Sequence, residues 1–181
     1  MQKTYKTGRG TGRQSHRMST HEAAPEAAPE AAPEAAPEAP GTGAAVRFDT
    51  KIAVLLRGDL ETWQRLNVTA FLVSGLGSQF PEVIGEPYED ADAVGYLPMF
   101  RQPVLVFEGT KETLTKAHAR VLSRALPRAL FTSDLFSTGN DRDNRAAVRA
   151  VPTAGLDLVG LAVYGPRNAV DKVLKGARMH P

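Results

Sequence analysis

Residues 50–181 predict a single α/β domain of three layers, with helices on both faces of a mixed, mainly parallel four-stranded sheet. Three observations support this fold class. Four apolar runs have the length of buried strands, helix-like segments alternate with them, and glycine, proline and capping residues mark most of the boundaries. A segment of this length can bury one hydrophobic core.

The first strand is expected at residues 52–56, where Ile-Ala-Val-Leu-Leu is apolar throughout, as in a strand buried on both faces. Asp59 is the predicted N-cap of a helix that runs from Leu60 to about Leu76. We expect the inward side of this helix to carry Trp63, Leu66, Ala70, Phe71 and Ser74, with Asn67 on the same stripe.

Residues 77–100 predict a long excursion with little regular structure, because glycine and proline recur through them. Long loops in compact domains are often functional. This loop carries an acidic cluster of Glu86, Glu89, Asp90 and Asp92. Carboxylates can hold a hard cation, but their spacing here matches no known loop pattern, so no metal site is predicted.

The second strand is expected at residues 104–107, and Thr110 is the predicted N-cap of the helix that follows it. This helix should reach Leu126, because Pro127 cannot continue it. The apolar run at 129–132 predicts the third strand.

A short helix is expected at residues 141–150, capped by Asn140 or Asp141, after a loop over 133–139. The nearly continuous apolar run at 156–163 predicts the fourth strand. Pro166 suits the first position of a last helix.

Residues 1–49 are predicted to be a disordered basic leader followed by a spacer. The spacer repeats Glu-Ala-Ala-Pro, and each interior proline costs a helix about 3 kcal/mol, so the repeat should be extended. The basic leader has two interpretations. It can contact nucleic acid or an acidic surface, or it can be a solvated extension without function.

Composition excludes several classes of function. The chain has no cysteine, which rules out disulfides, thiolate zinc sites and a cysteine nucleophile. It has no apolar run long enough to span a membrane and no secretory signal, so a cytoplasmic location is expected. No Walker loop, Gly-x-Ser-x-Gly elbow or dinucleotide-binding glycine motif is present, and no cofactor is predicted.

The opening KIAVLLRGDLETWQRLNVTAFLVSG resembles that of the type II peptidyl-tRNA hydrolases, in which a strand ending in Arg-x-Asp-Leu leads into a helix. The closing VGLAVYGPRNAVDKVLKGARMHP is similar to that family's closing strand, Gly-Pro turn and helix. Between them, the segment from Asp134 to Thr138 resembles the hydrolases' Asp-Ala-Gly-Arg-Thr segment in its two end residues.

The chain is more specifically similar to a bacterial family catalogued as domain of unknown function 2000, in the same peptidyl-tRNA hydrolase-like superfamily. This similarity lies in LNVTAFL, the segment 85–95, the region of Thr138 and Asn144, and the VDK-x-x-KG ending. The resemblance implies the hydrolase-like fold and a homodimer as the assembly to test for, and it implies no proven activity.

The resemblance also implies site residues: Asp134 and Thr138 as catalytic candidates, with Asn67 and Asn144 as candidate ligand-binding residues. Arg145 is a further ligand-binding candidate, because its spacing from Arg142 and Arg149 puts the three on one helix face that can bind an anion. Asp134 would orient or deprotonate a water, and Thr138 would donate a hydrogen bond to an oxyanion. Asn67 stands where the hydrolases have a lysine, so it offers amide donors and an acceptor in place of a positive charge.

Each candidate also has a structural interpretation. Asn67 can be a core residue with satisfied hydrogen bonds, and Asp134 and Thr138 can complete a turn. Arg145 can belong to a solvated helix face with Arg142 and Arg149.

Three functions therefore stay open. The domain can bind a small molecule or a partner in a repurposed pocket, which the loss of the lysine favours. It can instead hydrolyse an ester-type or peptidyl-tRNA-like substrate with Asp134 and Thr138, or bind RNA through its basic segments. Convergence of Asn67, Asp134 and Thr138 on one pocket is the expectation that a structure tests.

Overall fold

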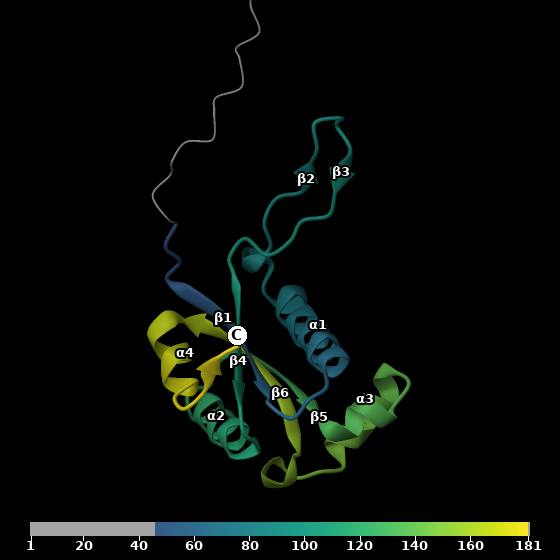
Figure 1. Cartoon of the computed structure of the whole chain (residues 1–181), viewed down its shortest axis with the longest axis vertical. Coiled ribbons are helices and arrows are strands. Elements are labelled where there is room, and N and C mark those ends of the chain that lie inside the picture. The colour runs from purple at the N-terminus through teal and green to yellow at the C-terminus, as the bar shows by residue number, and fades with distance from the viewer. Residues whose placement is uncertain (1–45, 181) are drawn as a thin grey trace, which may run out of the picture. The chain divides into compact units, whose positions relative to one another are not determined.

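The computed structural model describes residues 46–180, which form a main sheet with helices packed against it (Figure 1). The sheet has five strands in the order β5-β6-β1-β4-β7, namely β1 Thr50–Arg57, β4 Val104–Gly109, β5 Arg128–Thr132, β6 Leu158–Pro166 and β7 Arg178–Met179. The α-helices are α1 Thr62–Gln79, α2 Lys111–Ser123, α3 Asp141–Arg149 and α4 Arg167–Val173. The predicted leader and spacer over residues 1–45 lie outside the described residues.

The prediction of a four-stranded, mainly parallel sheet is wrong in two respects. β7 adds a fifth strand, paired with β4 through Phe107 and Glu108. Of the four neighbouring pairs, β1 with β4 is parallel, whereas β1 with β6, β5 with β6 and β4 with β7 are antiparallel. Alternation of strands and helices predicts that helices cover the sheet, but it does not specify the direction in which each strand joins it.

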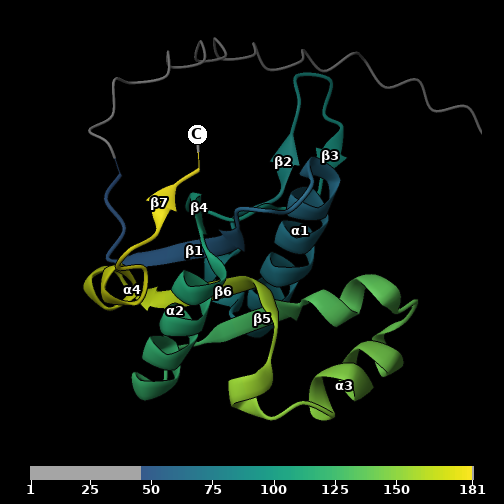
Figure 2. The same ribbon diagram turned by 60° about the horizontal axis from the view of Figure 1, so that its bottom comes forward.

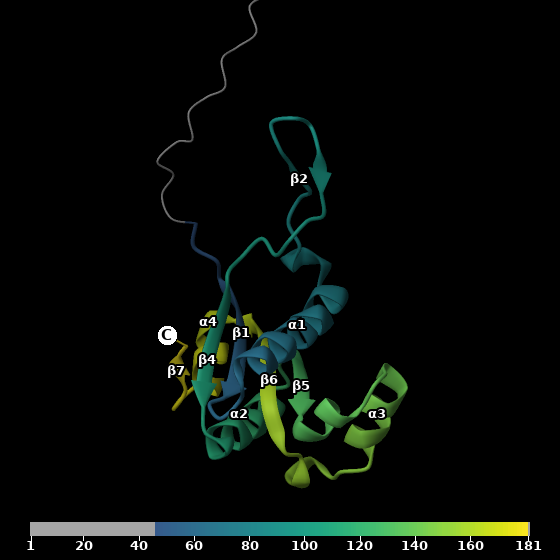
Figure 3. The same cartoon turned by 45° about the vertical axis from the view of Figure 1, so that its right-hand side comes forward.

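The predicted layers are present: α1 covers one face of the sheet, and α2 and α4 cover the other (Figures 2 and 3). Strand β1 is buried on both faces, as its apolar run predicts. Ile52, Val54 and Leu56 belong to the core under α1. Ala53 and Leu55 belong to the core under α2 and α4.

Helix α1 differs from its prediction in its start and in its buried side. It begins at Thr62, and the backbone N–H of Glu61 donates to the Gln64 side chain over 2.9 Å. The N-cap is Glu61 rather than the predicted Asp59, which lies outside the helix and accepts a hydrogen bond from Arg57 Nε at 2.7 Å.

The residues of α1 that face the sheet are Val68, Leu72 and Leu76. Trp63 and Leu66, which were expected on that side, are 60% and 69% exposed. Asn67 is also exposed, so its interpretation as a core residue is wrong. Ala70, Phe71 and Ser74 are exposed as well, so the predicted inward side is wrong. The helix carries apolar residues on both sides, and their pattern alone does not specify which side packs on the sheet.

The predicted caps of the next two helices are confirmed. Thr110 accepts a hydrogen bond from the backbone N–H of Thr113 at 3.3 Å, and Asn140 accepts one from Asp143 at 3.0 Å. Helix α3 contains no fully buried residue and packs against the 3₁₀ turn η2, Ser133–Ser137. It therefore belongs to the connection between the antiparallel strands β5 and β6, outside the two helical layers.

The segment between α1 and β4 begins with the 3₁₀ turn η1, Pro81–Val83, and continues as an arm over residues 84–100 that reaches away from the sheet (Figure 1). The short strands β2, Tyr88–Glu89, and β3, Gly95–Tyr96, pair antiparallel within it. Asp90 holds the turn by accepting the backbone N–H groups of Asp92 and Val94, each at 3.0 Å. The prediction of a long excursion with little regular structure is confirmed, since η1 and these two short strands are its regular elements.

Residues 46–49 precede the sheet without forming a helix or strand. The carbonyl of Phe48 accepts a hydrogen bond from the Arg167 side chain, and the Asp49 carbonyl accepts the Arg167 backbone N–H at 2.9 Å. These contacts join the end of the predicted tail to the domain. Among the described residues, no helix has the length and apolar character needed to cross a membrane.

Candidate functional site

Three of the predicted site residues lie around one cavity of about 340 Å³ between α1, η2 and α3. They are Asn67 from α1, Thr138 from the loop after η2, and Asn144 from α3. We refer to this space as the aromatic cavity; its lining residues are Trp63, Asn67, Phe71, Phe131, Leu135, Phe136, Thr138, Gly139, Asn140, Asp141 and Asn144.

The aromatic wall follows from helical spacing. Trp63, Asn67 and Phe71 are four residues apart on α1, so they share one face of that helix. The Trp63 ring meets the Phe136 ring edge-on at a centroid distance of 5.8 Å, and Phe136 lies 5.2 Å from Phe131. These contacts join the exposed side of α1 to η2 and β5, and the rings form one apolar wall of the cavity.

Thr138 and Asn144 connect the loop after η2 to α3. The Thr138 hydroxyl lies 2.9 Å from the Leu135 carbonyl and is also hydrogen-bonded to the side-chain amide of Asn144. A hydroxyl has one proton, so it cannot donate to both oxygens. Turning over the Asn144 amide resolves this, because its N–H then donates to Thr138 while Thr138 donates to Leu135.

Asn67 differs from the other two polar residues. Within residues 46–180, its amide forms no hydrogen bond to protein atoms, and its side chain is exposed at the cavity. Its two N–H donors and its acceptor oxygen are therefore available to a ligand or to water.

Asp134 and Arg145 do not join this group. Asp134 is exposed and does not line the aromatic cavity. Arg145 is exposed and pairs with Asp141 one helical turn away, Nη2 to Oδ2 at 3.0 Å, as expected of a solvated helix face. Of the predicted triplet, the structure thus brings Asn67 and Thr138 together and leaves Asp134 outside.

A larger opening, of about 850 Å³, lies at the carboxyl ends of β1 and β4. We refer to it as the charged opening; its lining residues are Arg57, Gly58, Asp59, Glu108, Gly109, Thr110, Lys111, Thr113, Asp157, Gly176 and Arg178. This opening was not predicted from the sequence. A signal was present, since both strands are followed by glycine and charged residues, but the parallel pairing of β1 with β4 was needed to bring these together.

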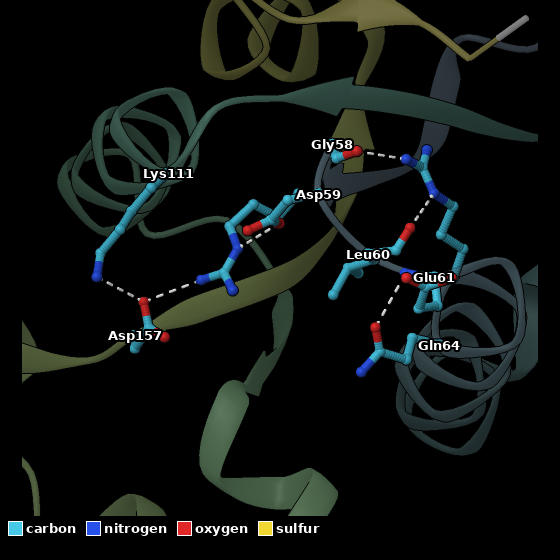
Figure 4. Close-up of polar contacts among 9 residues, drawn as sticks. Gly58, Asp59, Leu60, Glu61, Gln64, Lys111 and Asp157 are labelled. Atoms are coloured by element: carbon cyan, nitrogen blue, oxygen red, sulfur yellow. Dashed lines mark hydrogen bonds and ion pairs between the residues drawn. The ribbon is translucent and has the colours of Figure 1, made fainter.

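Asp157 lies between two cations in this opening. Its Oδ1 atom is 2.7 Å from Lys111 Nζ and 3.0 Å from Arg57 Nη1 (Figure 4). The Lys111 ammonium, the Ser133 hydroxyl and the Arg57 guanidinium together lower the pKa of Asp157 to about 2. The carboxylate therefore stays ionised at neutral pH and keeps both cations in position.

Glu108, at the end of β4, is the most buried acid of the opening, with 7% of its side chain exposed. Arg65 Nη1 donates to its Oε2 atom at 2.8 Å, and Arg178 Nε donates to Oε1 at 2.6 Å. The hydrogen bond from Arg65 and, to a smaller extent, that from Arg178 lower the pKa of Glu108. Arg65 also donates to the Leu60 and Gly58 carbonyls, which fixes the turn between β1 and α1 (Figure 4).

Residues 46–180 contain no cluster of three histidine or acidic side chains arranged to hold a metal ion. In the acidic arm, Asp90 Oδ2 instead accepts a hydrogen bond from the Tyr96 hydroxyl at 2.6 Å, and this contact lowers the pKa of Asp90. The carboxylate thus stabilises the arm itself.

Comparison with known proteins gives the following relationships. The pattern of a family described as "Protein of unknown function (DUF2000)" matches residues 50–181. A solved structure of a protein of unknown function from Agrobacterium tumefaciens strain C58 is 44% identical, with a TM-score of 0.73 over 75% of this chain and 100% of that chain. A search of curated proteins gives no match.

Proposed function

The chain belongs to the DUF2000 family of proteins of unknown function, and from this premise we propose that its domain binds a small organic molecule in the aromatic cavity. The observation that carries the proposal is the meeting of Asn67, Thr138 and Asn144, from three separate segments, around one opening. A cavity of about 340 Å³ is within the range of small-molecule sites.

The lining favours a flat ligand that carries an amide or hydroxyl group. Rings of Trp63, Phe71 and Phe136 supply apolar contact area, which suits a ring on the ligand. The amide of Asn67 can both donate and accept, so it fits a neutral polar group better than a charged one.

We further infer that the family belongs to the type II peptidyl-tRNA hydrolase-like superfamily. The Arg57-Gly58-Asp59-Leu60 segment, the spacing of Asp134 and Thr138, and the Gly165-Pro166 turn support this relationship. In this relationship the hydrolases' lysine is replaced by Asn67, and Asp134 lies outside the cavity. Both differences favour ligand binding over hydrolysis at this site.

Fluorescence of Trp63 tests the proposal, because Trp63 is the single tryptophan of the chain and lines the cavity. We expect benzamide, which combines a ring with an amide, to change its emission in a saturable manner. Asn67→Ala should weaken binding about fivefold through loss of one hydrogen bond.

Asn168→Ala is the matched control, since Asn168 is an exposed asparagine on α4 outside the cavity lining. It should leave the benzamide titration unchanged. A linear response without saturation, or equal weakening by the two substitutions, would contradict binding in the aromatic cavity.

A further inference from the structure

The charged opening lies at the carboxyl ends of the parallel neighbours β1 and β4. The chain leaves these two strands toward opposite faces of the sheet. Arg57 at the end of β1 is in register with Gly109 at the end of β4. After β1 the chain enters α1 on one face, and after β4 it enters α2 on the other. In open α/β sheets, the crevice outside such a divergence is the usual place for a ligand.

Two cations in this opening are held in place and still have hydrogen-bond donors left. Arg57, with 16% of its side chain exposed, donates through Nε to Asp59 at 2.7 Å and through Nη1 to Asp157 at 3.0 Å. Among the described residues, its Nη2 has no acceptor, and Lys111 pairs with Asp157 alone. A guanidinium has five N–H donors and an ammonium three, so both groups can bind a further acceptor.

The buried acid of the opening does not oppose an anion, because Arg65 and Arg178 both neutralise Glu108. Arg57, Arg65, Lys111 and Arg178 stand against three carboxylates in and beside the opening, those of Asp59, Glu108 and Asp157, which leaves one net positive charge. Arg178 belongs to β7 and Arg65 to α1. Their shared contact with Glu108 therefore holds these two elements together at the edge of the opening before a ligand binds.

The lining also distinguishes this opening from the aromatic cavity. Among the described residues that line it, none is aromatic, and three are glycines that leave the backbone accessible: Gly58, Gly109 and Gly176. Its volume of about 850 Å³ accommodates a small metabolite rather than a single ion. The ligand is therefore expected to be polar and to present an anionic group.

We propose that the charged opening is a second ligand site, which binds a small polar molecule through a carboxylate or phosphate group held by Arg57 and Lys111. Charge-assisted hydrogen bonds from these cations provide the attraction, and Asp59 and Asp157 fix the Arg57 guanidinium before the ligand arrives. This site is separate from the aromatic cavity and does not depend on ligand binding there.

Titration of the isotope-labelled full chain by NMR tests the proposal, with inorganic phosphate and malonate as probes and sodium chloride to keep ionic strength constant. We expect saturable shifts of the Gly58, Gly109 and Lys111 amides. Saturation with phosphate alone would identify a phosphate ligand, and saturation with malonate alone a carboxylate. Either result supports the site.

The matched variants are Lys111→Met and Lys116→Met, both of exposed lysines on α2, of which Lys111 lines the opening. Lys111→Met should weaken binding about tenfold, as expected for loss of one charge-assisted contact, and Lys116→Met should not. If neither probe saturates, or if both variants weaken binding equally, the charged opening is not an anion site.

Discussion

Gly160 of β6 lies so close to Val68 of α1 that a Cβ atom at residue 160 would be 2.4 Å from the Val68 Cγ1 atom. The same added carbon would be 2.9 Å from Leu72 Cδ1. The missing side chain therefore sets how closely α1 packs on the sheet, and it does so opposite two of the most buried residues of that helix. This distance in turn positions the outer face of α1, which carries Asn67.

Gly160→Ala is expected to lower the free energy of unfolding by about 1–3 kcal/mol, because α1 must move outward to admit the methyl group. Urea denaturation measures the change. Gly95→Ala in the arm is the control, since nothing lies within 4 Å of a Cβ at that position, and it should change stability by less than about 0.5 kcal/mol. Equal stability of the two variants would mean that the core relaxes around the methyl at no cost.

Purified protein is expected not to cleave peptidyl-tRNA above background. Asn67 supplies no positive charge where the hydrolases have a lysine, and Asp134 lies outside the aromatic cavity. Asn67→Lys alone should not create activity, because residues 135–137 also differ from the hydrolases. Release of a labelled peptide from peptidyl-tRNA is the measurement, and turnover that disappears in Asp134→Ala would overturn the expectation.

His118 on α2 should make stability depend on pH in mildly acidic solution. Burial of the ring, with a further effect of Arg128, lowers the pKa of His118 below 6.5. The unfolded chain then binds the proton more readily, so the free energy of unfolding should fall as pH drops below about 6.5 and level off above it. Denaturation at several pH values measures this slope, and His118→Gln should flatten it. An unchanged slope in that variant would assign the effect to other groups.

Asp157 should contribute at a lower pH. Its pKa is about 2 in the folded protein against 3.8 ordinarily, so its stabilising contribution is complete above pH 3.8 and is lost as pH falls toward 2. Asp157→Asn should reduce stability at neutral pH and weaken the loss in this acidic range. The measurement is the melting temperature of each variant at about pH 5 and about pH 3. Asp92→Asn, an exposed position in the arm, is the control and should keep the wild-type dependence on pH.

Much of the fold could be predicted from the sequence because its signals are local. The apolar run of β1 and the caps Thr110 and Asn140 depend on a few neighbouring residues and are confirmed. Strand β7 was missed because two residues, Arg178 and Met179, carry no recognisable pattern. Strand directions were missed because pairing depends on contacts between distant segments.

The site was predictable in part, through resemblance to a known family. Family resemblance identified Asn67, Thr138 and Asn144, and these line one cavity. The sequence could not predict which side of α1 is buried, because Trp63 and Phe71 are as apolar as the residues that face the sheet. The charged opening requires the register of β1 with β4, which neither strand specifies alone.

The central position of β1 has a consequence for folding during synthesis. Ile52 pairs with Val104 on one side and with Tyr164 on the other, so one partner is made about 110 residues later. Until β6 leaves the ribosome, β1 has an unpaired edge and apolar side chains without their final cover. The nascent chain therefore cannot complete its core segment by segment, because the sheet stays open at β1 until nearly the whole domain has been made.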